Sequence, residues 1–277
     1  YGLWAVLRIL PLDAASAFKG ALARANRPRL GLTRRARRQV ARTLPAMTEA
    51  EIGTAVREMW EYVGRMVGEF VHLDSLSTQC PDARIELIGE EHVEYAKHSG
   101  RPCLFFAGHL GNWELGALVG RLQGLDVTLV YRAANNPYVE RLIQRCRRPV
   151  GGSMLPKGHR AARGITDTMR RGGVLGMLVD QKTNNGIEVP FFGRPAMTTQ
   201  APALCALSYD CLMLPVQVER LTGAHFRVTV HPPLDVKPTD DRAADMRNVT
   251  AAINAVVEGW IRHRPAQWMW LHRRWAD

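Results

Sequence analysis

Short apolar runs alternate with helical segments over most of the chain, from about residue 84 onward. Apolar runs bounded by turns are typical of buried strands, and their alternation with helices is typical of βαβ units. The pattern predicts an α/β fold with a mostly parallel or mixed central sheet flanked by helices. The expected strands are Ile85–Ile88, Cys103–Ala107, Val127–Tyr131, Val174–Val179, Leu212–Val218 and Phe226–Val230.

Residues 1–75 carry helical patterns instead. After Thr48, apolar residues recur at three- and four-residue spacing, which predicts a helix that is capped by Thr48 and buries this stripe in the core. Residues 1–25 are also helical in pattern, and either lie at an interface or pack on the main domain. We expect one domain over residues 1–277, with 1–75 as a helical, membrane-proximal extension, 84–277 as the α/β core, and a last long helix at 241–262.

Polar side chains follow three of the expected strands. His109 follows the second strand, Arg132 follows the third, and Asp180-Gln181-Lys182 follows the fourth. Ligands bind beyond the carboxyl ends of strands in open α/β sheets, so parallel neighbours would bring these groups to one edge. A histidine base, a carboxylate and two cations at that edge would suit a polar or phosphorylated substrate.

His109 and Glu114 are candidates for acid–base chemistry. A neutral imidazole accepts a proton near neutral pH, and a carboxylate on its other nitrogen fixes the tautomer and stabilises the imidazolium. A spacing of five places two side chains roughly 140° apart within one helix, so they meet only if His109 lies in a turn. Gly108 and Gly111 permit such a turn, and Asn112 is an acceptable helix cap.

Composition adds a strong positive charge to this picture. The formal net charge is +11, and residues 14–48 carry basic side chains but no acidic one. Arginine suits phosphate and carboxylate ligands, so the charge favours anionic lipid or nucleic acid, although a GC-rich genome would also enrich arginine. Five cysteines without a regular spacing suit reduced thiols, and no apolar run is long enough to span a membrane. The chain opens at Tyr1 rather than Met, so we leave open an anchor or signal ahead of it.

Several familiar site types are not supported. No P-loop or G-x-G-x-x-G follows a strand, no G-x-S-x-G elbow is present, and the other eight histidines lack metal-ligand spacing. The sequence therefore predicts neither a metal site nor a serine hydrolase, and those histidines are interpreted as structural or solvated. Four tryptophans interleaved with arginines at residues 260–275 favour a membrane interface, with tryptophans packed on the sheet as the alternative.

Four ordered motifs and the sequence Gln267-Trp-Met-Trp-Leu-His-Arg-Arg-Trp275 carry a family resemblance. The motifs are His109-Leu-Gly-Asn-Trp-Glu114, Val130-Tyr-Arg132-Ala-Ala-Asn-Asn-Pro137, Val179-Asp-Gln-Lys182 and Val189-Pro-Phe-Phe-Gly-Arg194-Pro195. Together they resemble the late acyltransferases of lipid A biosynthesis, the lauroyl and myristoyl transferase group. The resemblance runs from about residue 1 to 275 and implies a glycerolipid-acyltransferase-like fold.

The resemblance implies transfer of a fatty acyl group from acyl carrier protein to a hydroxyl of a lipid A precursor, at the cytoplasmic face of the inner membrane. It implies no cofactor, with the acyl carrier protein thioester as co-substrate. His109 would be the base that deprotonates the acceptor hydroxyl, and Glu114 would orient it; many relatives have Asp at this position. The residues expected to bind substrate are Asn112, Arg132, Asp180, Gln181, Lys182 and Arg194.

Two other interpretations remain open. Acyl transfer to a glycerolipid or a phosphoinositide mannoside would use the same histidine chemistry, although glycerolipid enzymes generally carry an F-P-E-G-type block where this chain has Val179-Asp-Gln181. A non-catalytic basic peripheral membrane protein is supported by charge alone, and no nucleic-acid-binding motif is recognisable.

Overall fold

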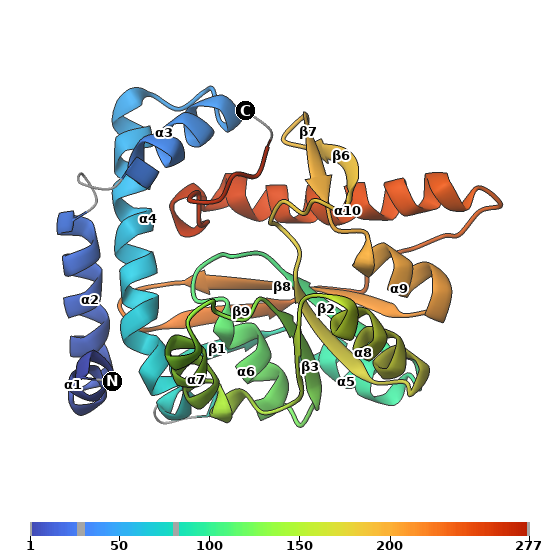
Figure 1. Ribbon diagram of the computed structural model, residues 1–277, viewed down its shortest axis with the longest axis horizontal. Coiled ribbons are helices and arrows are strands. Elements are labelled where there is room, and N and C mark those ends of the chain that lie inside the picture. Colours follow the sequence, from blue (N-terminus) through green and yellow to red (C-terminus); the bar gives the residue numbers. More distant parts are fainter. Residues whose placement is uncertain (1, 27–30, 80–82, 276–277) are drawn as a thin grey trace.

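The computed structural model describes residues 2–26, 31–79 and 83–275, and it is an α/β protein built on a seven-stranded sheet (Figure 1). The strand order is β1-β9-β8-β2-β5-β3-β4. The strands are β1 (Ile85–Ile88), β2 (Cys103–Ala107), β3 (Val127–Tyr131), β4 (Met154–Pro156), β5 (Val174–Leu178), β8 (Leu212–Arg220) and β9 (Phe226–Val230). The expected α/β class with a mixed central sheet is therefore confirmed.

The sheet is parallel except where β8 and β9 pair antiparallel. All six expected strands are present, and β5 ends one residue earlier than expected. The pattern missed β4, which has only three residues, and the separate antiparallel hairpin of β6 (Ile187–Phe191) and β7 (Arg194–Thr198). Pro190 and Pro195 face each other in that hairpin, and proline within a run argues against a strand in sequence analysis.

Helices cover both faces of the sheet. Ile253 of α10 packs in one core with Phe106 and Met177, while Leu115 of α6 packs in the other with Leu214. The helices of this α/β region are α5 (Glu90–His98), α6 (Glu114–Leu122), α7 (Pro137–Cys146), α8 (His159–Arg170), α9 (Ala201–Tyr209) and α10 (Arg242–His263), with short 3₁₀ turns η3 (Arg148–Val150) and η4 (Pro265–Gln267). The two faces therefore bury separate apolar layers.

The first part of the chain is helical, as expected. Its elements are α1 (Gly2–Ile9), α2 (Leu12–Asn26), α3 (Gly31–Thr43), α4 (Glu49–Glu69) and η2 (Phe70–Ser75). Thr48 caps α4 in a capping box with Glu51, which confirms the predicted start of this helix. A side chain added at Gly68 would lie 2.3 Å from the Ala15 carbonyl oxygen, so glycine lets α2 and α4 pack closely.

The tryptophans near the end of the chain belong to the core. Trp260, Trp268, Trp270 and Trp275 are each no more than 7 % exposed, so the alternative of packed tryptophans is confirmed and the membrane interface at these residues is wrong. Arg274 is also buried, and its guanidinium donates to the Met197 carbonyl and the Thr198 hydroxyl. These contacts join the segment 267–275 to the β6–β7 hairpin.

Two smaller expectations concern the cysteines and the membrane. Cys103, Cys146, Cys205 and Cys211 are free and buried, while Cys80 lies outside the described residues. Within the described ranges, no helix is both long enough and apolar enough to cross a bilayer.

Candidate active site

His109 lies in a tight turn at the carboxyl end of β2. Gly111 has a φ of 55°, and a side chain there would lie 2.8 Å from the Val218 carbonyl oxygen, so the turn requires glycine. The segment 267–275 closes over this turn. The Met269 amide donates to the His109 carbonyl at 3.1 Å, and the Gly111 amide donates to the Gln267 carbonyl at 3.0 Å. The backbone of the histidine is therefore fixed by two parts of the chain far apart in sequence.

Asp180 holds the imidazole of His109. It follows β5, which pairs in parallel with β2, so both residues leave the sheet at the same edge. Its Oδ1 accepts from His109 Nδ1 at 2.7 Å, and its Oδ2 accepts from the His109 amide at 2.8 Å and from Trp268 Nε1 at 2.6 Å. Burial alone would raise the pKa of Asp180, but the His109 charge and these hydrogen bonds outweigh it and hold that pKa below its usual range.

Gln181 bridges two histidines. Its Nε2 lies 2.9 Å from His109 Nε2 and 2.7 Å from His272 Nε2. An amide NH₂ is a donor, so both ring nitrogens act as acceptors, and His109 carries its proton on Nδ1, toward Asp180. Burial, aided by the charges of His109, Lys157 and Arg35, lowers the pKa of His272 to about 4, so this second imidazole is neutral at pH 7.

Glu114, the carboxylate expected to orient His109, pairs with Arg147 instead. Both of its oxygens accept from Arg147, at 2.6 and 2.9 Å, and the pair is largely buried. The expected pairing is therefore corrected: the carboxylate on His109 Nδ1 comes from Asp180, which follows β5, the parallel neighbour of β2. The reason is that α6 begins at Glu114 itself, which directs this side chain toward η3 rather than back to the turn.

Asn112 is completely buried, so its side chain is not exposed to a substrate. Its amide donates to Glu69 Oε2 at 3.0 Å, and Glu69 also accepts two hydrogen bonds from Arg220. The Ser16 hydroxyl donates to the same carboxylate. This network ties the turn after His109 to α2, α4 and β8. The Asn112 side chain also makes no cap, because it faces Glu69.

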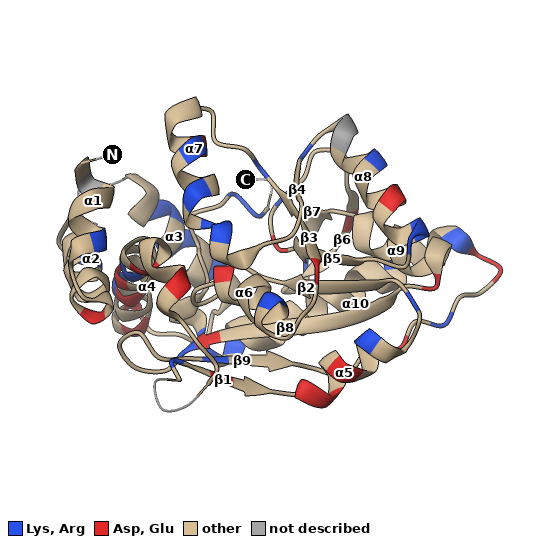
Figure 2. Cartoon of the chain, turned by 90° about the horizontal axis from the view of Figure 1, so that it is seen from below, with Lys and Arg blue, Asp and Glu red and all other residues tan. Residues whose placement is uncertain are grey.

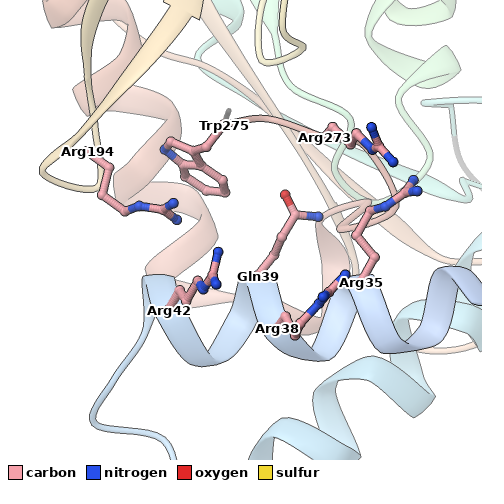
Figure 3. A pocket seen from close by; sticks show the side chains of 7 residues that line it. All are labelled: Arg35, Arg38, Gln39, Arg42, Arg194, Arg273 and Trp275. Atoms are coloured by element: carbon pink, nitrogen blue, oxygen red, sulfur yellow. The ribbon is translucent and has the colours of Figure 1, made fainter. Parts of the chain in front are cut away.

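The three expected cations have different positions. Arg132 and Lys182 are exposed and follow β3 and β5, at the same edge of the sheet as His109, which agrees with the expected convergence. Arg194 instead opens β7, where its guanidinium lies over the ring of Trp275 at 4.8 Å. There it lines a cleft with arginines of α3 (Figure 3).

Three residues of this site, His272, Trp268 and Arg147, are not predicted by the sequence. The spacing of His272 to the other histidines fits no metal site, which favours a structural or solvated histidine. The pattern around Trp268 favours either a membrane interface or packing on the sheet. Both belong to the last of the quoted sequences, Gln267–Trp275, which was the available signal. Arg147 lies outside every quoted motif, so only the fold brings it to Glu114.

The site so described has an imidazole at the carboxyl end of a parallel strand, with a buried carboxylate on its Nδ1. Among the described residues, no Ser, Thr or Cys side chain forms a hydrogen bond with this imidazole. An imidazole held in this way can act as a general base.

The model of the bacterial lipid A biosynthesis acyltransferase family matches residues 1–277, so the chain belongs to this family. It is therefore an acyltransferase of lipid A biosynthesis with a lipid substrate. It is 30 % identical over 238 residues to a lipid A biosynthesis lauroyltransferase of Escherichia coli (strain K12). The aligned residues make up 83 % of this chain and 74 % of that protein.

Two further relatives differ in the acceptor that their names give. A lipid A biosynthesis palmitoleoyltransferase of Escherichia coli (strain K12) is 26 % identical over 204 residues, which is 70 % of this chain and 63 % of that protein. A phosphatidylinositol mannoside acyltransferase of Mycobacterium tuberculosis is 24 % identical over 246 residues, which is 86 % of this chain and 76 % of that protein.

Proposed function

We propose that this protein transfers a fatty acyl group from acyl carrier protein to a hydroxyl of a lipid A precursor, with His109 as general base and Asp180 as its orienting carboxylate. The observation that carries this proposal is the direction of the imidazole. Nδ1 is held by Asp180, so the lone pair of Nε2 is left to accept a proton.

In the proposed reaction the acceptor hydroxyl donates its hydrogen bond to His109 Nε2, in place of the Gln181 amide. The hydroxyl oxygen attacks the thioester carbonyl carbon, and His109 takes the proton. The C–S bond breaks as the intermediate collapses, and the imidazolium returns the proton to the thiolate of the carrier. An ester and a free thiol result. Asp180 lowers the barrier because its buried negative charge stabilises the imidazolium formed in the first step.

Charge supports both partners of this reaction. The formal net charge is +11, and Figure 2 shows basic residues along α3 and α7. Carrier proteins of this type are acidic and the acceptor is an anionic lipid, so a basic surface speeds the encounter with each. Arg132 and Lys182 would then meet anionic groups at the mouth of the site.

Exposed apolar side chains on α1 and α2 support a place at the membrane surface. Val6, Ile9, Phe18 and Leu22 are large, and each is exposed over more than two fifths of its surface. Such residues beside basic ones are typical of helices that lie in the headgroup region of a bilayer. We therefore assign the protein to the cytoplasmic face of the inner membrane, with α1 and α2 toward the lipid.

A second acceptor class is a phosphatidylinositol mannoside. The observation that favours it is the similarity to the mycobacterial acyltransferase of that name, which extends over more of this chain than the similarity to the palmitoleoyltransferase does. The proposed histidine chemistry is the same for both acceptors, so only the acceptor distinguishes them.

To test this function, the purified protein is incubated with thioesters of acyl carrier protein that carry acyl chains of several lengths. The acceptors are a lipid A precursor, a phosphatidylinositol mannoside and a lysophospholipid, each tested separately. We expect acyl transfer to the lipid A precursor, and its loss in His109→Ala. Transfer to another acceptor alone would replace the proposed acceptor, and full activity of the His109→Ala variant would refute the mechanism.

A further inference from the structure

A small cleft beside the active site is lined by five arginines, here called the arginine cleft (Figure 3). Arg35, Arg38 and Arg42 come from α3, Arg194 comes from the start of β7, and Arg273 comes from the segment 267–275. They are brought together by the tertiary fold, since their positions span most of the chain.

The arginine cleft is held in shape by contacts with the backbone. Gln39, between Arg38 and Arg42 on α3, donates to the carbonyls of Trp270 and His272 at 2.6 and 2.7 Å. The Arg35 guanidinium donates to the Leu271 carbonyl at 3.2 Å. These bonds fix α3 against the segment 267–275, so the arginines on the two elements cannot simply move apart.

No carboxylate lines the arginine cleft. Within the described part of the chain, Arg38, Arg42 and Arg273 form no ion pair, whereas Arg37 of the same helix pairs with Glu49 of α4. Gathering like charges opposes folding, and a bound anion relieves that repulsion. The planar fork of arginine matches phosphate oxygens two at a time, which makes phosphate the best-suited anion.

The arginine cleft is small, which argues against a protein as its occupant. Its enclosed volume is about 20 Å³, so only the tip of a ligand, such as one phosphate group, can enter it. A carrier protein would instead need a broad contact surface. A phosphate monoester carries close to two negative charges at neutral pH, while the phosphodiester of a carrier's prosthetic arm carries one. Five cations therefore favour the monoester.

The arginine cleft also lies next to the catalytic groups. Arg273 follows His272, which Gln181 connects to His109 Nε2. The Arg35 guanidinium donates to the carbonyl of Leu271, the residue just before His272. A phosphate held here would therefore contact the same segment, 267–275, that carries His272.

We propose that the arginine cleft binds a phosphate monoester on the headgroup of the acceptor lipid and thereby fixes which hydroxyl reaches His109. The inference rests on the proposed function only for the identity of the acceptor. Binding of the phosphate itself follows from the arginines and can be measured without turnover.

The test measures binding by calorimetry in neutral detergent micelles. The probes are a glucosamine lipid that carries hydroxyacyl chains and phosphate monoesters, and the same lipid after enzymatic dephosphorylation. The protein is compared with an Arg38→Gln/Arg42→Gln double variant. Arg34→Gln is the matched control, because Arg34 is an exposed arginine of the same helix outside the cleft. Thermal unfolding checks that the variants fold.

We expect the protein to bind the phosphorylated probe about 10- to 100-fold more tightly than the dephosphorylated one, as charge-assisted hydrogen bonds of this kind allow. The ratio should fall close to one in the double variant and stay unchanged in the control. An unchanged ratio in the double variant, or an equal loss in the control, overturns the proposal. Weakened binding of acyl carrier protein instead would make the carrier the occupant.

A parallel acyl-transfer assay separates this proposal from the proposed function. If the preference for phosphate depends on the arginines but the protein transfers no acyl group, phosphate binding by the cleft is supported and the proposed function is refuted. If the protein transfers acyl groups and the double variant keeps the preference, the proposed function is supported and phosphate binding by the cleft is refuted.

Discussion

Replacing Asp180 by asparagine would reverse the tautomer of His109. Three N–H groups point at the Asp180 carboxylate, two at Oδ2 and one at Oδ1. Asparagine has one oxygen and one NH₂ group, so it cannot accept from both directions. If its oxygen keeps the two donors at the Oδ2 position, its NH₂ faces His109 Nδ1. The imidazole must then place its proton on Nε2, where the base is needed.

The size of the effect follows from the two ways of placing the amide. The opposite orientation preserves the bond to Nδ1 but leaves two buried donors, the His109 amide and Trp268 Nε1, without an acceptor. Each unsatisfied donor costs about 1–3 kcal/mol, so this orientation is the less stable one. The unproductive tautomer therefore dominates. An Asp→Asn change behind a catalytic histidine of a serine protease lowers kcat by about 10⁴ for this reason, and we expect about 10³ to 10⁴ here.

The assay measures kcat for transfer from an acyl carrier protein thioester to the lipid A precursor, with thermal unfolding as a check on folding. Nitrogen-15 NMR of the histidine rings reports which nitrogen of His109 carries the proton. Asp210→Asn is the matched control, because Asp210 is exposed and pairs with Arg101 outside the site. A kcat near that of the unchanged protein in a folded Asp180→Asn variant, with the proton on Nε2 as expected, would refute the role given to Asp180.

Three further predictions concern buried titratable groups. Glu114→Gln should lower the unfolding free energy by about 3–5 kcal/mol in denaturant titration, because it leaves Arg147 without its carboxylate, while the His109 proton stays on Nδ1 by NMR. Glu69→Gln should destabilise the protein by a similar amount, since Arg220 is almost fully buried; a stability unchanged by it would contradict the network. The unfolding free energy should fall as the pH drops from 6.5 to about 4, because His272 binds a proton in the unfolded chain before it does so in the folded one; in His272→Gln this part of the slope should vanish.

Most strands of the sheet can be predicted because the signal for a strand lies in its own short run of residues. Each expected strand is a run of apolar residues whose own composition identifies it, and the chemistry at the ends of β2, β3 and β5 followed from the rule for parallel neighbours. The β6–β7 hairpin was not predicted because proline within a run argues against a strand. In the structure, Pro190 and Pro195 lie opposite each other in this two-stranded hairpin.

The partner of His109 could not be derived in the same way. Glu114 is close to the histidine in sequence and Asp180 is 71 residues away, so proximity along the chain favoured the wrong carboxylate. The neighbour relation of β2 and β5 decides the matter, and strand order is a tertiary property. The burial of the tryptophans was equally inaccessible, because interleaved arginines such as Arg274 look solvated until the fold supplies acceptors for them.

Because segment 267–275 packs over His109 and follows the strands of the sheet in the sequence, the site is completed only after the sheet has been synthesised. Trp268 supplies one of the three donors on Asp180, Met269 holds the His109 backbone, and His272 shares the Gln181 amide. A ribosome-bound chain in which the sheet has formed but these residues have not yet emerged would lack all three restraints on the base. If His109 is the base proposed above, catalysis would then begin only after translation has passed this segment.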